Sequence, residues 1–298
     1  MAPLRRVRRA HTLRGSRASP RGPVSRLRCQ LRAAARPSDL DLRAYLGSPL
    51  PVLGVPAGAL ESIARSARRE LSTRPAVDLA RLAEALWRGS TYDERALAIV
   101  LLRQDRRRLG RSAWHRMDRW VDAATGWALS DALAGGPIAE IVAADRARVR
   151  ELERWTRSEN PWRRRAALYA LSRRLRAGDL RSAMRVIDRL REDPEFWVQR
   201  AVGTWLRECW KVDERATRRY LRRHAARLPR VTLTVATERA PTTYRAALRA
   251  VARRSRRGPD RPTRPPTRST RPRAAPGRRP GSARRTKRTS RRRTERGA

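Results

Sequence analysis

An aromatic ring and a carboxylate stand four residues apart in this chain, at Trp127 and Asp131. If the segment is helical, positions i and i+4 lie one above the other on the same face. An indole attracts a cation through its π face, and a carboxylate attracts it by charge. The pair therefore predicts a site for a ligand that is flat and positively charged.

The pair falls within a repeat that has a period of 35 residues. Aromatic residues recur at this spacing at Tyr92, Trp127, Trp162 and Trp197. The residues four positions further on are Ala96, Asp131, Ala166 and Ala201. An alanine suits a position where two helices pack closely, so an acid there departs from the pattern, and such departures indicate function. The alternative for Asp131 is a helix N-cap or a solvated acid.

The sequence around the repeat predicts the helices that would position it. Residues 78–87 place Leu and Trp at amphipathic spacing, and residues 94–102 are apolar enough for a buried helix. Asn160-Pro161 and Asp193-Pro194 have the pattern of a helix start, an N-cap residue followed by proline in the first turn. A period near 35 is typical of paired-helix repeats such as TPR, ankyrin and HEAT-like units.

These features predict an all-α fold, a HEAT-like α-α superhelical solenoid of about six helix pairs. Residues 231–235 are β-rich but isolated, and we expect them to be helical. The predicted repeat domain covers residues 39–254. Residues 1–38 and 255–298 mix Arg with Pro and Gly and lack an apolar period, so we expect a disordered basic N-terminal extension and a disordered Arg/Pro-rich tail.

The charge of the chain is strongly positive, with 73 Lys and Arg against 28 Asp and Glu, a net charge of +45. Such a balance favours a polyanionic partner, with nucleic acid first and an anionic membrane surface second. The alternative is the bias of a GC-rich genome, since Lys211 and Lys287 are the only lysines. We expect a basic concave face that binds double-stranded DNA. We expect the protein to be a monomer and not to bind a membrane.

Several other classes of protein are excluded by what the sequence lacks. The chain has no Gly-rich phosphate loop with a lysine, so a nucleotide hydrolase is not expected. The three histidines are scattered and neither cysteine has a CxxC neighbour, which predicts no metal site. Two cysteines and the absence of a long apolar run indicate a cytoplasmic protein, which we expect to be bacterial and associated with the nucleoid. The Arg- and Ser-rich start is similar in composition to a transit peptide, but we interpret it as a basic extension.

Three segments together resemble a known family. They are Trp127-(x3)-Asp131, the run from Trp162 to Ala167, and the run from Phe196 to Glu208. They are similar to the HEAT-like-repeat DNA alkylation-repair glycosylases, the AlkD family, over about residues 40–250. The resemblance implies an enzyme that excises cationic N3- or N7-alkylpurines from duplex DNA without metal or cofactor.

The resemblance also assigns roles to residues of this chain. It implies that Asp131 is catalytic, that Trp127 packs on the deoxyribose or the base, and that Arg165 holds a backbone phosphate. The family carries a second tryptophan directly after a glycine, whereas Gly203 is followed here by Thr204, and the tryptophan is Trp205. A shift of one residue turns a helical side chain by about 100°. Trp205 is then a candidate DNA contact or a core residue.

Further candidates have a structural alternative beside the functional one. Tyr45 is a DNA contact or a core residue, and Arg164 and Arg200 face phosphates or solvent. We expect Trp162 and Trp197 to pack between helices, because they recur with the repeat. Two other functions remain open at this point, a non-catalytic HEAT-repeat protein that binds DNA or acts as a scaffold, and a protein-binding solenoid whose charge reflects genome composition.

Overall fold

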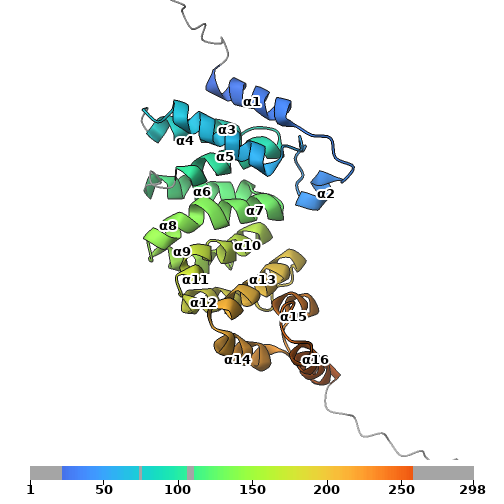
Figure 1. Ribbon diagram of the computed structural model, residues 1–298. Helices are drawn as coiled ribbons and strands as arrows, with labels where there is room; N and C mark the ends of the chain where they lie inside the picture. The colour runs from blue at the N-terminus through green and yellow to red at the C-terminus, as the bar shows by residue number, and fades with distance from the viewer. Residues whose placement is uncertain (1–21, 74–75, 106–110, 258–298) are drawn as a thin grey trace, which may run out of the picture. The chain divides into compact units, whose positions relative to one another are not determined.

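The described part of the chain consists of helices and the turns between them, with no strand. The computed structural model describes residues 22–73, 76–105 and 111–257. They lie within one compact unit, and the residues from Pro259 onward are assigned to a second unit, outside the described residues. The helices of the first unit stack side by side in chain order (Figure 1). The prediction of an all-α fold built from helical repeats is confirmed.

The elements of the unit are short to medium helices, one of which is a π-helical turn labelled η2. Their bounds are α1 Pro23–Ala34, α2 Leu42–Leu46, α3 Ala57–Glu70, α4 Ala76–Trp87, α5 Tyr92–Gln104, α6 Arg111–Ala123, α7 Trp127–Leu133, η2 Ala134–Ile138, α8 Ala139–Ala144, α9 Arg148–Trp155, α10 Pro161–Tyr169, α11 Ser172–Arg176, α12 Leu180–Leu190, α13 Phe196–Val212, α14 Glu214–His224, α15 Arg230–Ala236 and α16 Thr242–Arg257.

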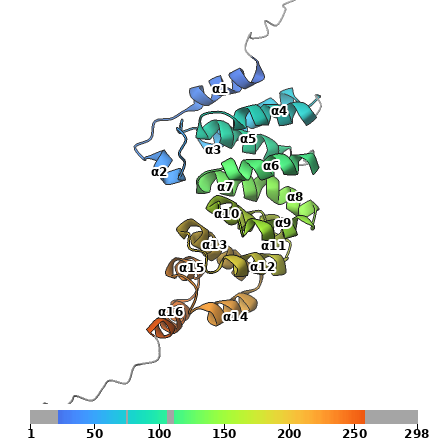
Figure 2. The ribbon, with the colours of Figure 1, turned by 180° about the vertical axis from the view of Figure 1, so that it is seen from behind.

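Four consecutive helix pairs carry the 35-residue repeat. The pairs are α4 with α5, α6 with α7, α9 with α10, and α12 with α13. The second helix of each pair begins at or next to the repeated aromatic residue, for example Trp127 in α7 and Trp162 in α10. Figures 1 and 2 show α9, α12 and α14 on one side of the stack and α10, α13 and α15 on the other. We call these two sides the first and the second layer, and α7 lies on the side of the second layer.

The repeat also explains how neighbouring second-layer helices are joined. The Oγ of Ser130 donates to the carbonyl of Trp162 at 3.1 Å, and the Nη1 of Arg165 donates to the carbonyl of Trp197 at 2.5 Å. Both donors stand three residues after a repeated aromatic residue, and both acceptors are the aromatic residue of the next repeat. Ala96, Ala166 and Ala201 are buried, as expected for close helix packing.

Local sequence signals account for most helix boundaries. Thr91 and Glu94 form a capping box at the start of α5, and Asn160 caps α10 by accepting from the N–H of Trp162 at 3.0 Å. The apolar side chains of residues 79–102 form part of the core, which confirms both helices expected there. The β-rich residues 231–235 lie inside α15, as predicted.

The start of the helical unit, the start of α13 and the exposure of Trp197 differ from the expectation. Part of the N-terminal segment expected to be disordered forms α1, because Leu27 and Leu31 are buried in the core and hold this helix to the unit. Asp193 does not cap α13, which begins at Phe196 and has Glu195 at its N-cap position. Trp197 was expected between helices, but its side chain is exposed at the start of α13. The disorder expected for residues 1–21 and 258–298 lies outside the described residues.

Candidate active site

Asp131 lies on α7 at the edge of a cavity in the second layer. At this repeat position the other helices have a buried alanine, whereas the Asp131 side chain keeps 15% of its surface exposed. The cavity measures about 680 Å³ and is lined by parts of α3, α5, α7, η2, α10, α11 and α13. An alanine here would present a methyl group to the cavity, so the aspartate is what makes this wall acidic.

Arg165 of α10 holds the carboxylate of Asp131 with two parallel hydrogen bonds. Its Nε donates to Oδ1 and its Nη2 donates to Oδ2, each at 2.6 Å. Nη2 also donates to the hydroxyl of Tyr169 at 3.0 Å, and the guanidinium lies 5.0 Å from the centre of that ring. Such a two-pronged pair fixes the orientation of the carboxylate plane as well as its charge.

The burial of this pair shifts the ionisation of both members. Burial raises the pKa of Asp131 above its ordinary value, while the hydrogen bonds and the charge of Arg165 act in the opposite direction. Burial lowers the pKa of Arg165 and Asp131 raises it, with a net rise, so the guanidinium stays charged. The carboxylate thus depends on Arg165 for much of its stability in the ionised form.

Trp205 is part of the wall of this cavity, on α13. Its indole is buried and meets the ring of Tyr169 edge to face, with the ring centres 5.6 Å apart. The indole Nε1 is buried and has no hydrogen-bond partner among the described residues. Thr204, directly before it, also lines the cavity and donates to the carbonyl of Arg200 at 3.0 Å. Trp205 is therefore a core residue that also lines the cavity, and its contact with DNA stays a prediction.

Trp127 lies at the other end of α7, outside the lining of the cavity. Its Nε1 donates to the carbonyl of Tyr45 at 2.8 Å, and the two rings meet edge to face with centres 5.9 Å apart. Gly126 precedes it with φ +90°, and a Cβ at Gly126 would stand 2.0 Å from the carbonyl oxygen of Gly47. The half-buried indole of Trp127 is thus fixed against the segment of α2, while Tyr45 is exposed.

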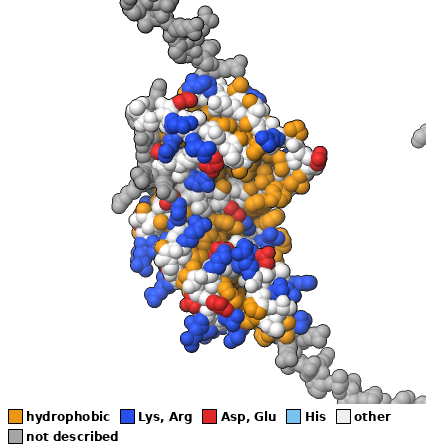
Figure 3. All heavy atoms as spheres, viewed as in Figure 1, with side chains coloured by type: hydrophobic (Ala, Val, Ile, Leu, Met, Phe, Trp, Pro, Cys, Tyr) orange, Lys and Arg blue, Asp and Glu red, His pale blue; other side chains and the backbone are white. Residues whose placement is uncertain are grey.

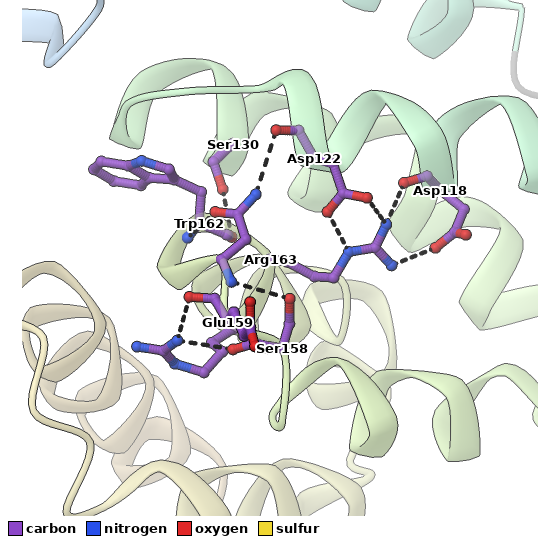
Figure 4. Close-up of polar contacts among 9 residues, drawn as sticks. Asp118, Asp122, Ser130, Ser158, Glu159, Trp162 and Arg163 are labelled. Atoms are coloured by element: carbon purple, nitrogen blue, oxygen red, sulfur yellow. Dashed lines mark hydrogen bonds and ion pairs between the residues drawn. The ribbon is translucent and has the colours of Figure 1, made fainter.

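The arginines expected to contact DNA differ in how they are paired. Arg165 is buried against Asp131, so its guanidinium orients the acid rather than facing the solvent as a phosphate ligand. Arg164 is paired with Asp193, through Nε at 2.6 Å and Nη2 at 3.1 Å. Its neighbour Arg163 bonds the carboxylates of Asp118 and Asp122 on α6, as Figure 4 shows. Arg163 therefore joins α10 to α6, and Arg164 joins α10 to the turn between α12 and α13.

Arg200 is the exposed arginine of the expected set. Its guanidinium lies 5.9 Å from the centre of the Trp197 ring, and both side chains are exposed at the start of α13. No acidic partner of Arg200 occurs among the described residues. Together with the exposed Tyr45, it remains available to contact a ligand.

Two features of the site were not expected from the sequence. Tyr169 touches both Arg165 and Trp205, and its spacing of four residues after Arg165 was the signal that could have identified it. Gly135 and Gly136 line the cavity within the π-helical turn η2, where Gly136 leaves the helical conformation just before Pro137. Such turns interrupt helices often near functional sites, and the Gly-Gly-Pro run was the signal for this one.

The described residues contain no group of three or more His, Cys, Asp or Glu side chains that could hold a metal ion. Across the same residues, no helix has the length and apolar character needed to cross a membrane.

Comparison with known proteins places this fold and site in context. The family model described as "DNA alkylation repair enzyme" matches residues 27–240. A predicted DNA alkylation repair enzyme from Enterococcus faecalis is similar in structure, with a TM-score of 0.60 and 20% identity, over 67% of this chain and 93% of that one. AlkD2 from Streptococcus mutans aligns with a TM-score of 0.50 and 19% identity, over 61% of this chain and 89% of that one. No curated protein matches the chain.

The identity to both structures is low, so they establish the helical repeat fold alone, whereas the family model covers most of the chain and includes Asp131, Arg165 and Trp205. The chain belongs to the DNA alkylation repair enzyme family.

Proposed function

We propose that this protein is a monofunctional DNA glycosylase that hydrolyses the N-glycosidic bond of cationic N3- and N7-alkylpurines in double-stranded DNA. The observation that carries the proposal is Asp131, a carboxylate held in a fixed orientation at the wall of a cavity, where the repeat otherwise has alanine. The protein acts on DNA as a monomer in the bacterial cytoplasm, and its chemistry uses neither a metal nor a cofactor.

The reaction needs little catalytic machinery because the substrate is unstable. Alkylation at N3 or N7 gives the purine a positive charge and makes it a good leaving group. The bond between C1′ and the base breaks, its electron pair neutralises the departing ring, and the sugar becomes an oxocarbenium-like cation. A water oxygen then bonds to C1′ and releases a proton. Glycosidases stabilise the same kind of cation with carboxylates.

Asp131 is suited to the cationic stage of this reaction. Its carboxylate stabilises positive charge on the sugar, and it orients the water or accepts its proton. A preoriented charge in a partly buried site is more effective than the same charge in water, because no solvent has to reorganise. Arg165 contributes by holding the carboxylate ionised and fixed.

The aromatic residues near the acid are suited to the flat cationic base. Trp205 and Tyr169 form part of the cavity wall, and Trp127 stands one turn of helix before Asp131. Attraction between a cation and an aromatic face contributes about 0.5–2 kcal/mol. We assign Tyr45 and Arg200 to contacts with the DNA, because both are exposed and neither has an acidic partner among the described residues.

A second candidate function is a non-catalytic repeat protein that binds DNA or acts as a scaffold. The pairing of Asp131 with Arg165 favours it, because an ion pair of this kind also joins α7 to α10 when the acid has no catalytic role. The two functions differ in one product, the free base.

The direct experiment incubates the full chain with a duplex that carries 7-methylguanine or 3-methyladenine and measures the released base by chromatography. Release above the spontaneous rate, in the presence of a chelator, is the expected result. Binding to the same duplex without any release would overturn the glycosylase proposal and favour the scaffold.

A further inference from the structure

The first layer of the unit carries an excess of arginine that the cavity does not use. Helices α9, α12 and α14 together contain eleven arginines and four acids. The arginines that are exposed on these helices are Arg150, Arg154, Arg181, Arg185, Arg189, Arg215, Arg219, Arg222 and Arg223. We call this set the arginine face.

The spacing of these residues places them in rows. Arg150 and Arg154 are four residues apart, as are Arg215 and Arg219, and α12 carries three arginines at successive spacings of four. Residues four apart lie on one helix face at about 6 Å along the axis. Each helix therefore presents one row of guanidinium groups in one direction.

The three helices lie next to one another, so the rows form one surface. Glu153 of α9 pairs with Arg185 of α12 at 3.0 Å, and Asp188 of α12 accepts from the hydroxyl of Tyr220 on α14 at 3.4 Å. Figure 3 shows Lys and Arg side chains along the lower left of the view, where Figure 1 places α12 and α14.

The four acids of these helices do not neutralise the surface. Each acid pairs with an arginine, and three of these acids, Glu151, Asp188 and Glu214, pair with arginines outside the arginine face, namely Arg148, Arg191 and Arg218. Seven members of the face have no ion pair with a described residue, namely Arg150, Arg154, Arg181, Arg215, Arg219, Arg222 and Arg223, and of these Arg222 lies over the ring of Tyr244. Charge of one sign on this scale attracts a polyanion.

The composition of the surface favours the backbone of a duplex as that polyanion. The exposed large hydrophobic side chains of the described residues lie on other elements, and the ring of Tyr220 on α14 is half-buried. Helices α9, α12 and α14 therefore offer no exposed aromatic ring for an unpaired base and no apolar anchor for a lipid bilayer. Arginine forks bind phosphate oxygens in a two-pronged way. Stacking platforms for single strands and interfacial membrane helices both need the apolar residues that are missing here.

The arginine face is also separate from the cavity, because none of its residues and none of its helices lines that cavity. We propose that the arginine face is a second DNA-binding surface, which takes the phosphate backbone of a duplex without reading its sequence. The protein then holds two duplex segments, one at the Asp131 cavity and one on the opposite layer. This inference does not depend on glycosylase activity.

The test measures whether one protein molecule bridges two duplexes. Undamaged duplexes carrying either a donor or an acceptor dye are mixed with the full chain, and energy transfer between the duplexes is recorded. The face variant replaces six of the seven unpaired arginines by glutamine, R150Q, R154Q, R181Q, R215Q, R219Q and R223Q. The control variant removes the same charge from six exposed arginines on other elements that form no ion pair with a described residue, R32Q, R65Q, R119Q, R230Q, R239Q and R249Q.

The face variant is expected to lose bridging by about 10-fold, while the control variant stays within about 2-fold of the wild type. The slope of log affinity against log salt should fall by about 0.9 for each phosphate contact removed. Bridging is measured on undamaged duplexes, from which no base is released, so its result is separate from the proposed chemistry. Unchanged bridging by the face variant would overturn the inference. The inference would also be overturned if the face variant kept its bridging of duplexes but lost binding to vesicles of anionic phospholipid, because the partner of the arginine face would then be a membrane.

Discussion

The carboxylate of Asp131 and the guanidinium of Arg165 meet in two parallel hydrogen bonds of 2.6 Å, across 34 positions of the chain. The pair joins α7 to α10, and the same guanidinium reaches the carbonyl of Trp197 at the start of α13. Three successive second-layer helices are thus connected through one side chain. Asp131, the acid that departs from the repeat, is therefore held by Arg165, which stands one position before the equivalent place in the next repeat, Ala166.

The first prediction concerns pH. The pKa of Asp131 is raised by burial, and Arg165 counteracts that rise. Removing the guanidinium in Arg165→Gln should raise this pKa further, so the carboxylate becomes neutral at a higher pH. Because the proposed reaction needs the ionised form, the acid limb of the rate profile for base release should move to higher pH.

The control for this prediction is Arg164→Gln, which removes a neighbouring arginine paired with Asp193 instead. Its profile should keep the acid limb of the wild type, and Arg165→Lys should lie between the two. A rate profile of Arg165→Gln that coincides with that of the wild type would show that Arg165 does not control the ionisation of Asp131.

The second prediction concerns stability. Asp131→Asn leaves the buried charge of Arg165 with a neutral partner, and breaking a buried pair costs about 3–5 kcal/mol. Since the amide oxygen still accepts one hydrogen bond, we expect a loss of about 2–4 kcal/mol in the free energy of unfolding. Denaturant titration followed by circular dichroism measures it. A loss below about 0.5 kcal/mol would show that the pair does not stabilise the fold.

The third prediction concerns Trp205. Its indole N–H has no partner among the described residues, so Trp205→Phe loses no hydrogen bond there and should change the free energy of unfolding by less than about 1.5 kcal/mol. Trp205→Ala removes a buried aromatic ring and should cost about 3–5 kcal/mol. If Trp205 helps to bind the base, Trp205→Phe should keep most of the base release. A complete loss in that variant would assign a specific role to the indole nitrogen.

The fourth prediction concerns the turn before α7. Gly126→Ala places a Cβ within 2.0 Å of the carbonyl oxygen of Gly47 and requires a left-handed φ of +90°. We expect a loss of more than about 2 kcal/mol and a displaced Trp127, seen as a shift in tryptophan fluorescence. Gly58→Ala on α3 is the control, since a Cβ there meets nothing within 4 Å. Equal stability of the two variants would contradict the close approach of α2 to α7.

Much of this fold could be predicted because residues of the same type recur every 35 positions. The buried alanines and the position of Asp131 follow from the 35-residue period, and the N-cap at Asn160 follows from the local sequence. The partners of the arginines could not be predicted, since Arg163, Arg164 and Arg165 are consecutive and identical in type. Their different partners are set by the direction in which each side chain leaves α10.

The start of the unit was misplaced for a related reason. The residues of α1 contain several arginines and no acid, which is the composition of a disordered segment. Leu27 and Leu31 nevertheless stand four apart and are buried together, so two side chains decide the outcome against the average composition. The position of Trp205 could not be predicted either. The direction of its side chain from α13 decides whether the ring lines the cavity, and the structure fixes that direction by packing the ring against Tyr169.

The most direct test of the proposed function compares two matched variants in a single-turnover base-release assay. Asp131→Asn and Asp193→Asn each remove the acid of a two-pronged arginine pair, at the cavity and away from it. On a duplex that contains 7-methylguanine, Asp131→Asn should lower the rate by at least about 100-fold, while Asp193→Asn should stay within about 3-fold of the wild type once both are folded. Equal rates for the two variants would contradict a catalytic role for Asp131.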